Sequence, residues 1–156
     1  MKKIKIVALC ISLISILTNC KKPKDFPLEP QIKFVSFTPI GDSARLRIHF
    51  TDGNGDIGLT EADTSADYKY NLFLEYHELI NNVWSQVNLL IPFYYRVPLL
   101  TQKKGEALEG EIEITIKPYY YNPSLNAADT IKYSIMLKDR ALNESNIEYT
   151  PVIIAP

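Results

Sequence analysis

The chain is poor in the residues from which many active sites and metal sites are built. Its 156 residues include only two cysteines, two histidines and one tryptophan. Both cysteines, Cys10 and Cys20, lie near the N-terminus. The rest of the chain therefore has no disulfide, no cysteine-ligated metal and no cysteine nucleophile. The formal net charge of −1 also argues against nucleic acid as a partner, because such binding is dominated by basic residues that neutralise phosphates.

Motifs of common enzyme classes are missing as well. The sequence has no G-x-S-x-G elbow, no phosphate-binding glycine loop and no H-E-x-x-H pair. We expect His49 and His77 on the outward faces of strands, and Glu111 and Glu113 to point from one strand into solvent. General acid–base chemistry needs such groups in a cleft. We therefore expect no catalysis, and a hydrolase would require one of the histidines to meet a carboxylate in a cleft.

No apolar run is long enough to span a membrane. The longest, residues 6–17, follows Lys2, Lys3 and Lys5 and has the length of a signal-peptide core. It ends in Leu17-Thr18-Asn19-Cys20, the pattern of a lipobox. We predict a lipoprotein signal over residues 1–19 and lipidation at Cys20, with acyl chains that would anchor the protein to a membrane. The alternative is a cleaved secretory signal followed by an incidental cysteine.

Residues 20–30 contain three prolines after a short basic run, which predicts an extended tether. From residue 31 onward apolar and polar residues alternate with the period of two that is typical of strands. No amphipathic helix of useful length is present, and turn residues separate the alternating runs. We expect strands at residues 31–38, 43–51, 68–78, 83–90, 92–100, 111–117, 130–138 and 147–154.

Strands at this spacing predict one all-β domain over residues 31–156. We expect an immunoglobulin-like or fibronectin-III-like antiparallel β-sandwich of seven to eight strands. Prolines interrupt residues 92–100, so this strand should lie at an edge, where it could accept a partner strand. Tyr133 is expected to point inward, either as a tyrosine corner or as ordinary core packing.

One loop stands out because oxygen-bearing side chains alternate in it with glycines. Asp52, Asn54 and Asp56 are spaced two residues apart, and Gly53, Gly55 and Gly58 allow a tight path. Such spacing directs several oxygens to one point, as Ca²⁺ requires. It is not an EF-hand loop, since Ile57 stands where that loop needs glycine. The alternative is a plain turn, because Asn and Asp also bond their own backbone.

The topology of a Greek-key sandwich adds a fourth candidate ligand. In that arrangement the loop after the second strand and the loop before the last strand lie at the same end of the domain. Here those loops are residues 52–67 and residues 139–146. We therefore predict that Asp139 completes a Ca²⁺ site begun by Asp52, Asn54 and Asp56.

Tyrosines cluster at two places, residues 94–95 and residues 119–121. Exposed tyrosines stack on sugar rings and anchor protein interfaces. Tyr119, Tyr120 and Tyr121 are thus candidate ligand-binding residues. The alternative is that these tyrosines form the half-buried rim of a sandwich, where alternation buries one of each adjacent pair.

Three stretches carry a resemblance to a known group. Residues 52–58 (DGNGDIG) resemble the D-G-D-G-D-I-G signature of small Bacteroidota lipoproteins of unknown function. Residues 108–112 and 139–146 resemble two further stretches of that group, and the second also resembles the D-x-A-G-N-x-S hairpin of bacterial immunoglobulin-like domains. The chain departs from these patterns at Asn54, where aspartate is usual, and at Leu142, where glycine is usual. The resemblance implies a surface or periplasmic lipoprotein with a sandwich domain, and it points to no particular activity because the group has no assigned biochemical function.

Together these observations predict a non-catalytic, lipid-anchored cell-envelope protein, in or on the outer membrane, whose Asp/Asn/Gly loop binds a structural Ca²⁺. The alternative is a glycan-binding or protein-binding surface module that uses its tyrosine clusters and no metal. In both cases the lipid anchor makes the membrane a partner.

Overall fold

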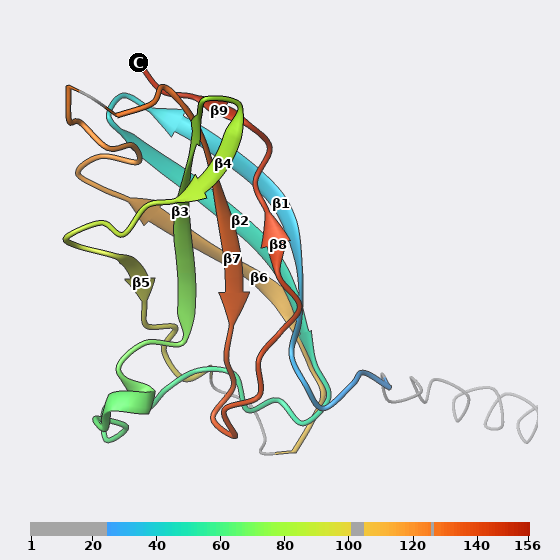
Figure 1. Cartoon of the computed structure of the whole chain (residues 1–156). Helices are drawn as coiled ribbons and strands as arrows, with labels where there is room; N and C mark the ends of the chain where they lie inside the picture. Colours follow the sequence, from blue (N-terminus) through green and yellow to red (C-terminus); the bar gives the residue numbers. More distant parts are fainter. Residues whose placement is uncertain (1–24, 101–104, 126) are drawn as a thin grey trace, which may run out of the picture.

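The structure is a computed structural model that describes residues 25–100, 105–125 and 127–156. In these residues the chain forms nine strands and one short 3₁₀ helix (η1, Ala66–Tyr68), and the strands build two sheets that face one another (Figure 1). The predicted antiparallel all-β sandwich is confirmed. The strand count is one above the predicted maximum, because the run expected at residues 147–154 is split around Pro151, which has no N–H to donate.

The first sheet has three antiparallel strands in the order β1-β2-β6. The central strand β2 alternates strictly, so that Leu46, Ile48 and Phe50 are at most 2% exposed while the residues between them face outward. Its neighbours pair with it along almost their whole length. The strands are β1 (Gln31–Ile40), β2 (Ser43–Asp52) and β6 (Leu108–Ile116).

The second sheet has β3 and β7 at its centre. Its order is β4-β3-β7-β8, with β5 also on β3 and β9 also on β7. β5 and β7 both pair with Leu72–Leu74, so β5 lies on the same side of β3 as β4 and is an edge segment. Its strands are β3 (Leu72–Ile80), β4 (Val83–Gln86), β5 (Phe93–Tyr95), β7 (Thr130–Leu137), β8 (Glu148–Tyr149) and β9 (Ile153–Ile154).

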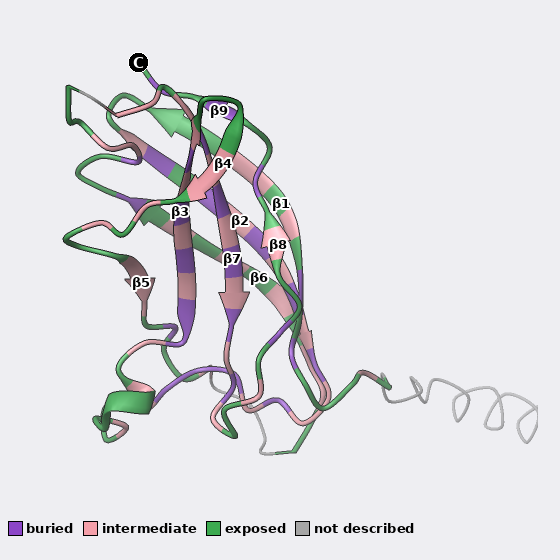
Figure 2. Cartoon of the chain, in the orientation of Figure 1, coloured by how far each residue is buried: buried purple, intermediate pink, exposed green. Residues whose placement is uncertain are grey.

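The core fills the space between the sheets, and buried positions alternate with more exposed ones along β2, β3 and β7 (Figure 2). Its largest fully buried side chains include Tyr76, Tyr133 and Phe50. The Tyr133 hydroxyl donates to the Tyr120 carbonyl, which ties the connection between β6 and β7 to the core. This bond reaches backbone 13 residues upstream, whereas a tyrosine corner reaches only a few, so Tyr133 fits the alternative of core packing.

Two strand ends matter for the site. β2 and β7 both run toward the end of the sandwich that also carries η1 (Figure 1). Asp52 ends β2, and Asp139 comes two residues after the end of β7. The two loops that were expected to share one end therefore do so.

The N-terminal part of the chain is only partly described. The predicted signal at residues 1–19, the lipidation site Cys20 and residues 21–24 of the tether lie outside the described residues, as do residues 101–104. The end of the predicted tether contacts the domain, since Pro30 is buried and the Gly53 N–H donates to the Pro27 carbonyl at 2.7 Å. Among the described residues, no helix is long and apolar enough to cross a membrane.

Candidate metal centre

Asp52 anchors the first loop of the site. It is the last residue of β2, and its side chain is fully buried. Its Oδ1 accepts hydrogen bonds from the backbone N–H groups of Asn54 at 3.0 Å and Gly55 at 2.5 Å. Gly55 adopts φ +65°, a left-handed conformation that glycine reaches without steric cost. These bonds form an Asx turn and account for only one of the two carboxylate oxygens.

Asp56 follows four residues later and is half-buried. Its N–H donates to Asn54 Oδ1 at 3.3 Å, so a second Asx turn continues the first. Asn54 was a predicted ligand, but its side-chain oxygen is occupied in this turn. The structure therefore gives Asn54 a role in shaping the loop. To bind a metal as well, Asn54 Oδ1 would have to contact the ion and the Asp56 N–H at the same time.

Asp139 approaches from the second loop and is 1% exposed. Asn143 donates to it twice, from its backbone N–H to Oδ1 at 2.8 Å and from Nδ2 to Oδ2 at 2.8 Å. This tight turn forces Leu142 to φ +67°, the position where the resembling hairpins carry glycine. The Asp139 side chain is thus held in place by its own loop.

Arg140 links the two loops, a role that the sequence did not suggest. Its N–H donates to the Asp56 carbonyl at 3.3 Å, and its Nη1 donates to the Gly58 carbonyl at 2.9 Å. The Tyr68 hydroxyl of η1 in turn donates to the Arg140 carbonyl at 3.1 Å. Only the tertiary structure reveals this link, because 82 residues separate Arg140 from Gly58 along the chain.

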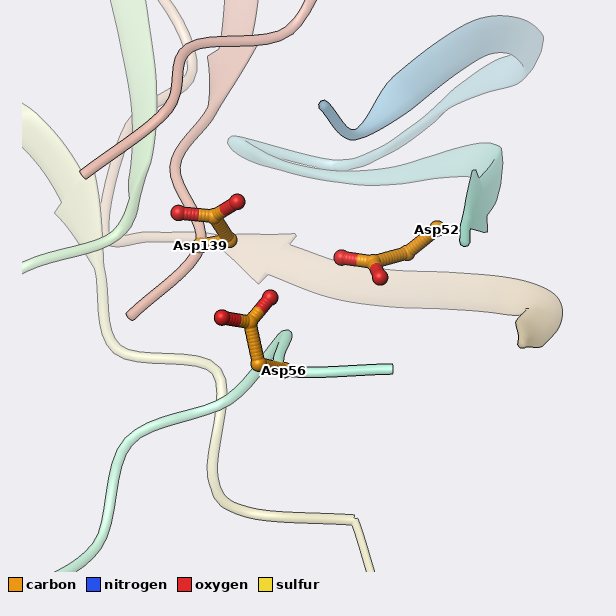
Figure 3. A group of neighbouring side chains, drawn as sticks. All are labelled: Asp52, Asp56 and Asp139. Atoms are coloured by element: carbon orange, nitrogen blue, oxygen red, sulfur yellow. The ribbon is translucent and has the colours of Figure 1, made fainter. Parts of the chain in front are cut away.

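The three aspartates face a common point (Figure 3). One carboxylate oxygen from each lies within 4.8 Å of the other two. Asp52 Oδ2 and Asp56 Oδ1 are buried and have no hydrogen-bond partner among the described residues. Buried polar atoms are nearly always hydrogen-bonded, so two orphaned carboxylate oxygens at one point need an explanation. A plain turn accounts for the hydrogen bonds that Asp52 Oδ1 and Asn54 Oδ1 accept. It does not account for the unpartnered oxygens Asp52 Oδ2 and Asp56 Oδ1.

The electrostatics of the cluster disfavour three negative charges. Burial raises the pKa of Asp52 above its ordinary value, against the lowering effect of the backbone hydrogen bonds from Gly55 and Asn54, and the charge of Asp139 raises it further. Burial also raises the pKa of Asp56, followed by the charges of Asp139 and Asp52, while Arg140 opposes the shift. Without a cation, therefore, the site takes up protons more readily than ordinary carboxylates do.

A hard divalent cation would fit this donor set. Ca²⁺ takes six to eight oxygen ligands at about 2.3–2.6 Å, and carboxylates are its preferred protein ligands. The site offers oxygen ligands only, with no histidine or cysteine in the cluster. Asp52, Asp56 and Asp139 would be the ligands, and water would complete the coordination shell.

The tyrosine cluster is only partly as predicted. Tyr119 and Tyr121 line a groove of about 460 Å³ together with residues 89–95. Tyr120 was wrongly expected on this surface: it is 3% exposed and packs edge-on against Phe37. Successive side chains of an extended segment point to opposite sides, so the middle tyrosine of the three enters the core.

The two histidines lie outside the metal cluster. His49 contacts Glu109 at 3.3 Å on the outer face of the first sheet, and His77 Nε2 lies 3.1 Å from Ser134 Oγ on the second sheet.

The sequence pattern did not predict one of the buried polar side chains, that of Asn71. Asn71 is 1% exposed, and its Oδ1 accepts the Val97 N–H at 2.7 Å, although alternation predicts an outward position. It lies just before β3, where the strand pattern no longer applies.

Comparisons of the chain with protein-family models, with curated proteins and with solved structures return no match.

Proposed function

We propose that this protein is a non-catalytic, lipid-anchored envelope protein whose sandwich is clasped at one end by Ca²⁺. The proposal rests on one observation: Asp52 is fully buried with one unpartnered carboxylate oxygen, and its carboxylate lies within 4.8 Å of those of Asp56 and Asp139. A divalent cation would pair that oxygen, cancel the repulsion among the three aspartates and join the loop after β2 to the loop after β7. The lipobox and the signal pattern at the N-terminus support the anchor.

The clasp has a defined mechanical role. Asp52 and Asp56 belong to the chain that leaves the first sheet, whereas Asp139 belongs to the chain that leaves the second. A cation between them would therefore connect the two sheets at the open end of the sandwich. Sites in extracellular modules commonly bind Ca²⁺ with dissociation constants of about 10⁻⁴–10⁻³ M. An envelope exposed to about 1 mM Ca²⁺ would keep such a site about half to nine-tenths filled.

Thermal unfolding tests the clasp. The full chain in a non-ionic detergent is unfolded in EGTA and across a CaCl₂ series, with MgCl₂ in parallel. A ligand that binds only the folded state at a hundred times its dissociation constant adds about 2.7 kcal/mol to the free energy of unfolding. We expect a dose-dependent rise in the unfolding midpoint. The rise should be smaller with Mg²⁺, which demands stricter octahedral geometry.

Two variants make this test specific. Asp56→Asn should abolish the response, because it removes a ligand charge without changing the shape of the side chain. Asp63→Asn is the matched control: Asp63 belongs to the same acidic loop, but its Oδ2 accepts bonds from Thr60 at 2.6 and 2.9 Å and is not part of the cluster. It should keep the full response. A wild-type midpoint that does not move with Ca²⁺ refutes the clasp.

The anchor is tested separately. Replacement of Cys20 by serine should abolish incorporation of a radiolabelled fatty acid and release the protein from the membrane fraction. Continued membrane retention without acylation would contradict the lipoprotein assignment.

A second candidate function is glycan binding at the tyrosine-lined groove. The Tyr94 hydroxyl donates to Glu75 at 2.6 Å and the Tyr121 hydroxyl to Asp42 at 3.0 Å, so both rings are held in position. Tyr119 is 40% exposed beside them. Rigid, partly exposed aromatic rings are suited to stacking on sugars. Calorimetric titration with cello-, malto- and chito-hexaose in EGTA, for wild type and Tyr119→Ala, would detect such binding and assign it to the groove.

A further inference from the structure

The two edge strands of the first sheet, β1 and β6, differ in whether other parts of the chain bond to their outer backbone groups. Along β1, the Asn146 side chain accepts the Ile32 N–H at 2.8 Å and donates to the Ile32 carbonyl at 2.9 Å. Glu148 accepts the Phe34 N–H at 3.2 Å. Side chains of the last connection thus satisfy the backbone of this edge. The part of this edge around Ile32 and Phe34 is therefore not available to another strand.

The opposite edge is β6, and no described strand pairs with its outer side. Its nine residues pair with β2 in continuous register from Leu108 to Ile116. In the described part of the chain, the backbone of residues 110–116 makes no backbone hydrogen bond except to β2. An antiparallel edge strand presents unpaired N–H and C=O groups at every second residue. A strand of this length therefore offers a row of donors and acceptors that an extended chain can use.

The inner face of β6 is also incompletely covered. Ile112 and Ile114 point toward the core but are only half-buried, whereas their neighbours on β2, Ile48 and Leu46, are at most 1% exposed. The difference arises because β2 has a strand on each side and β6 has only one. An added strand with an apolar side chain at every second position would cover these isoleucines.

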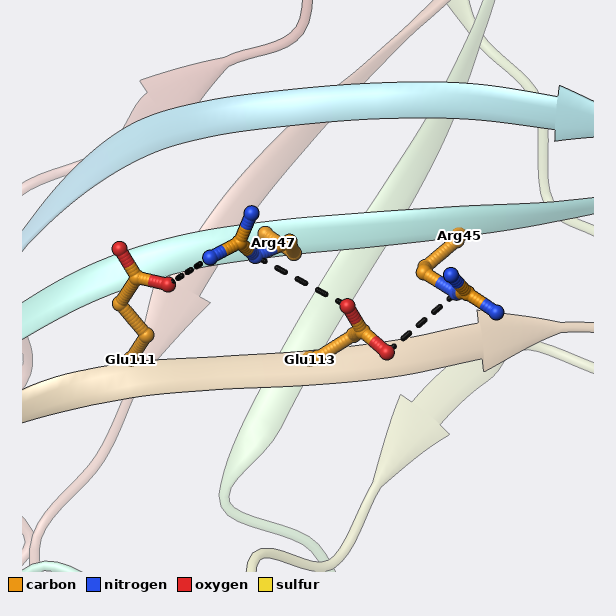
Figure 4. A network of polar contacts seen from close by, with 4 residues as sticks. All are labelled: Arg45, Arg47, Glu111 and Glu113. Carbon is orange, nitrogen blue, oxygen red and sulfur yellow. Dashed lines mark hydrogen bonds and ion pairs between the residues drawn. The ribbon is translucent and has the colours of Figure 1, made fainter.

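The outer face of β6 specifies the charge of such a strand. Glu111 and Glu113 project from it and pair with arginines of β2 (Figure 4). Arg45 Nε lies 3.3 Å from Glu113 Oε1, and Arg47 contacts both glutamates. The arginines lie one strand further in, so carboxylates are the charges nearest to the edge. Both glutamate side chains are more than 40% exposed, which leaves them accessible to cations from the other side.

A second copy of the same chain is a poor occupant. If two β6 strands paired antiparallel, the glutamate rows of the two copies would lie opposite one another. Like charges directly opposite on neighbouring strands are destabilising. The occupant that matches both faces is an extended segment in which apolar residues alternate with lysine or arginine.

We propose that the free edge of β6 docks such a segment of a partner protein by strand addition, as the fourth strand of this sheet. Backbone hydrogen bonds to residues 110–116 hold the segment. Its apolar residues cover Ile112 and Ile114, and its cations meet Glu111 and Glu113. This proposal does not depend on Ca²⁺ binding, because none of the three aspartates belongs to the edge residues 110–116: Asp52 pairs with Leu108, and Asp56 and Asp139 lie in loops.

The test uses the full chain in a non-ionic detergent and the peptide Thr-Lys-Val-Lys-Val-Lys-Val-Thr-amide with fluorescein attached to its N-terminus. Fluorescence anisotropy measures binding, and amide hydrogen exchange locates it. We expect saturable binding with slower exchange within residues 110–116. The same peptide with glutamate in place of lysine should bind at least tenfold more weakly. A lysine peptide N-methylated at alternate residues keeps the charges but cannot donate along one edge, and it should not protect these amides.

Variants assign the charge contact. Glu111→Gln/Glu113→Gln should weaken binding of the lysine peptide about tenfold. The matched control Glu61→Gln/Asp67→Asn removes the same charge from an exposed loop and should bind as wild type does. If the edge variant does not fold, as an unfolding curve would show, the peptide with glutamate in place of lysine still tests the charge contact on the wild-type protein.

Three results would overturn the proposal. The first is no binding of the lysine peptide at about 1 mM. The second is equal binding of the N-methylated peptide, which would indicate charge attraction without strand addition. The third is protection of residues 110–116 that depends on protein concentration without peptide, which would show that a second copy covers the edge.

Discussion

Replacement of Asp52 by asparagine should stabilise this protein when no divalent cation is present. Asparagine keeps the shape of the side chain and an Oδ1 that accepts the N–H groups of Asn54 and Gly55. It removes a buried charge whose second oxygen has no described partner. The new Nδ2 would also place a donor close to the carboxylates of Asp56 and Asp139. A substitution that destroys a proposed ligand is therefore expected to improve the cation-free fold.

The magnitude follows from the spacing of the carboxylates. The carboxylate oxygens lie within 4.8 Å of one another, and at that limit two unit charges repel by about 3.5 kcal/mol at an effective dielectric constant of about 20. The cluster relieves part of this repulsion by taking up protons, because burial raises the pKa of Asp52 and of Asp56. We therefore expect Asp52→Asn to gain about 1–3 kcal/mol at neutral pH in EGTA. In a domain of this size, each kcal/mol corresponds to roughly 3–5 °C in the unfolding midpoint.

The assay is urea unfolding in EGTA of wild type, Asp52→Asn and Asp63→Asn. Asp63→Asn changes the charge equally, but hydrogen bonds from Thr60 lower the pKa of Asp63, so its loss should reduce stability. The two variants are thus expected to shift the midpoint in opposite directions. An Asp52→Asn protein that is less stable than wild type in EGTA would refute the reasoning. It would show that the Asp52 charge stabilises the protein more through its hydrogen bonds in the Asx turn than it destabilises it by repelling Asp56 and Asp139.

Three further predictions concern the same end of the molecule. The pKa values of Asp52 and Asp56 are raised in the folded protein, so at pH values above 3.8 the folded state holds more protons than the unfolded state. The stability of the wild type in EGTA should therefore fall as the pH rises from 3.8 through the raised pKa values. The stability advantage of Asp52→Asn over wild type should shrink toward about pH 4. Gly53→Ala should lower the free energy of unfolding by at least about 1 kcal/mol and speed hydrogen exchange of the residue-53 amide, because the new Cβ would lie 2.6 Å from the Pro27 carbonyl oxygen. An unchanged exchange rate would contradict this contact. Leu142→Asn should stabilise the protein by about 0.5–1 kcal/mol in chemical denaturation, because leucine is strained at φ +67° and asparagine tolerates that conformation. A loss of stability would mean that the packing of the 40% exposed leucine side chain stabilises the protein by more than the strained backbone destabilises it.

Much of the fold could be predicted from local sequence. The alternation of Leu46, Ile48 and Phe50 placed them on the core face, and Asn81-Asn82, both at positive φ, form a turn between the strands expected at residues 68–78 and 83–90. The Asx turn at Asp52 was likewise an expectation from residue type. These features depend on neighbours one to four residues away, so the chain carries their signal locally. The proximity of Asp139 followed from a topological rule once the sandwich had been inferred.

The features that carry function were decided by tertiary structure. Only packing determines that Asp52 Oδ2 is buried without a partner, that Tyr120 enters the core while Tyr119 remains exposed, and that Arg140 ties two distant loops together. The sequence alone also did not show which edge of the first sheet would be left open. Side chains from the C-terminal connection bond the backbone of Ile32 and Phe34 in β1, and no hydrogen bond from a described side chain reaches the backbone of residues 110–116. Burial and edge exposure depend on which segments approach from elsewhere in the chain, and no local pattern encodes that approach.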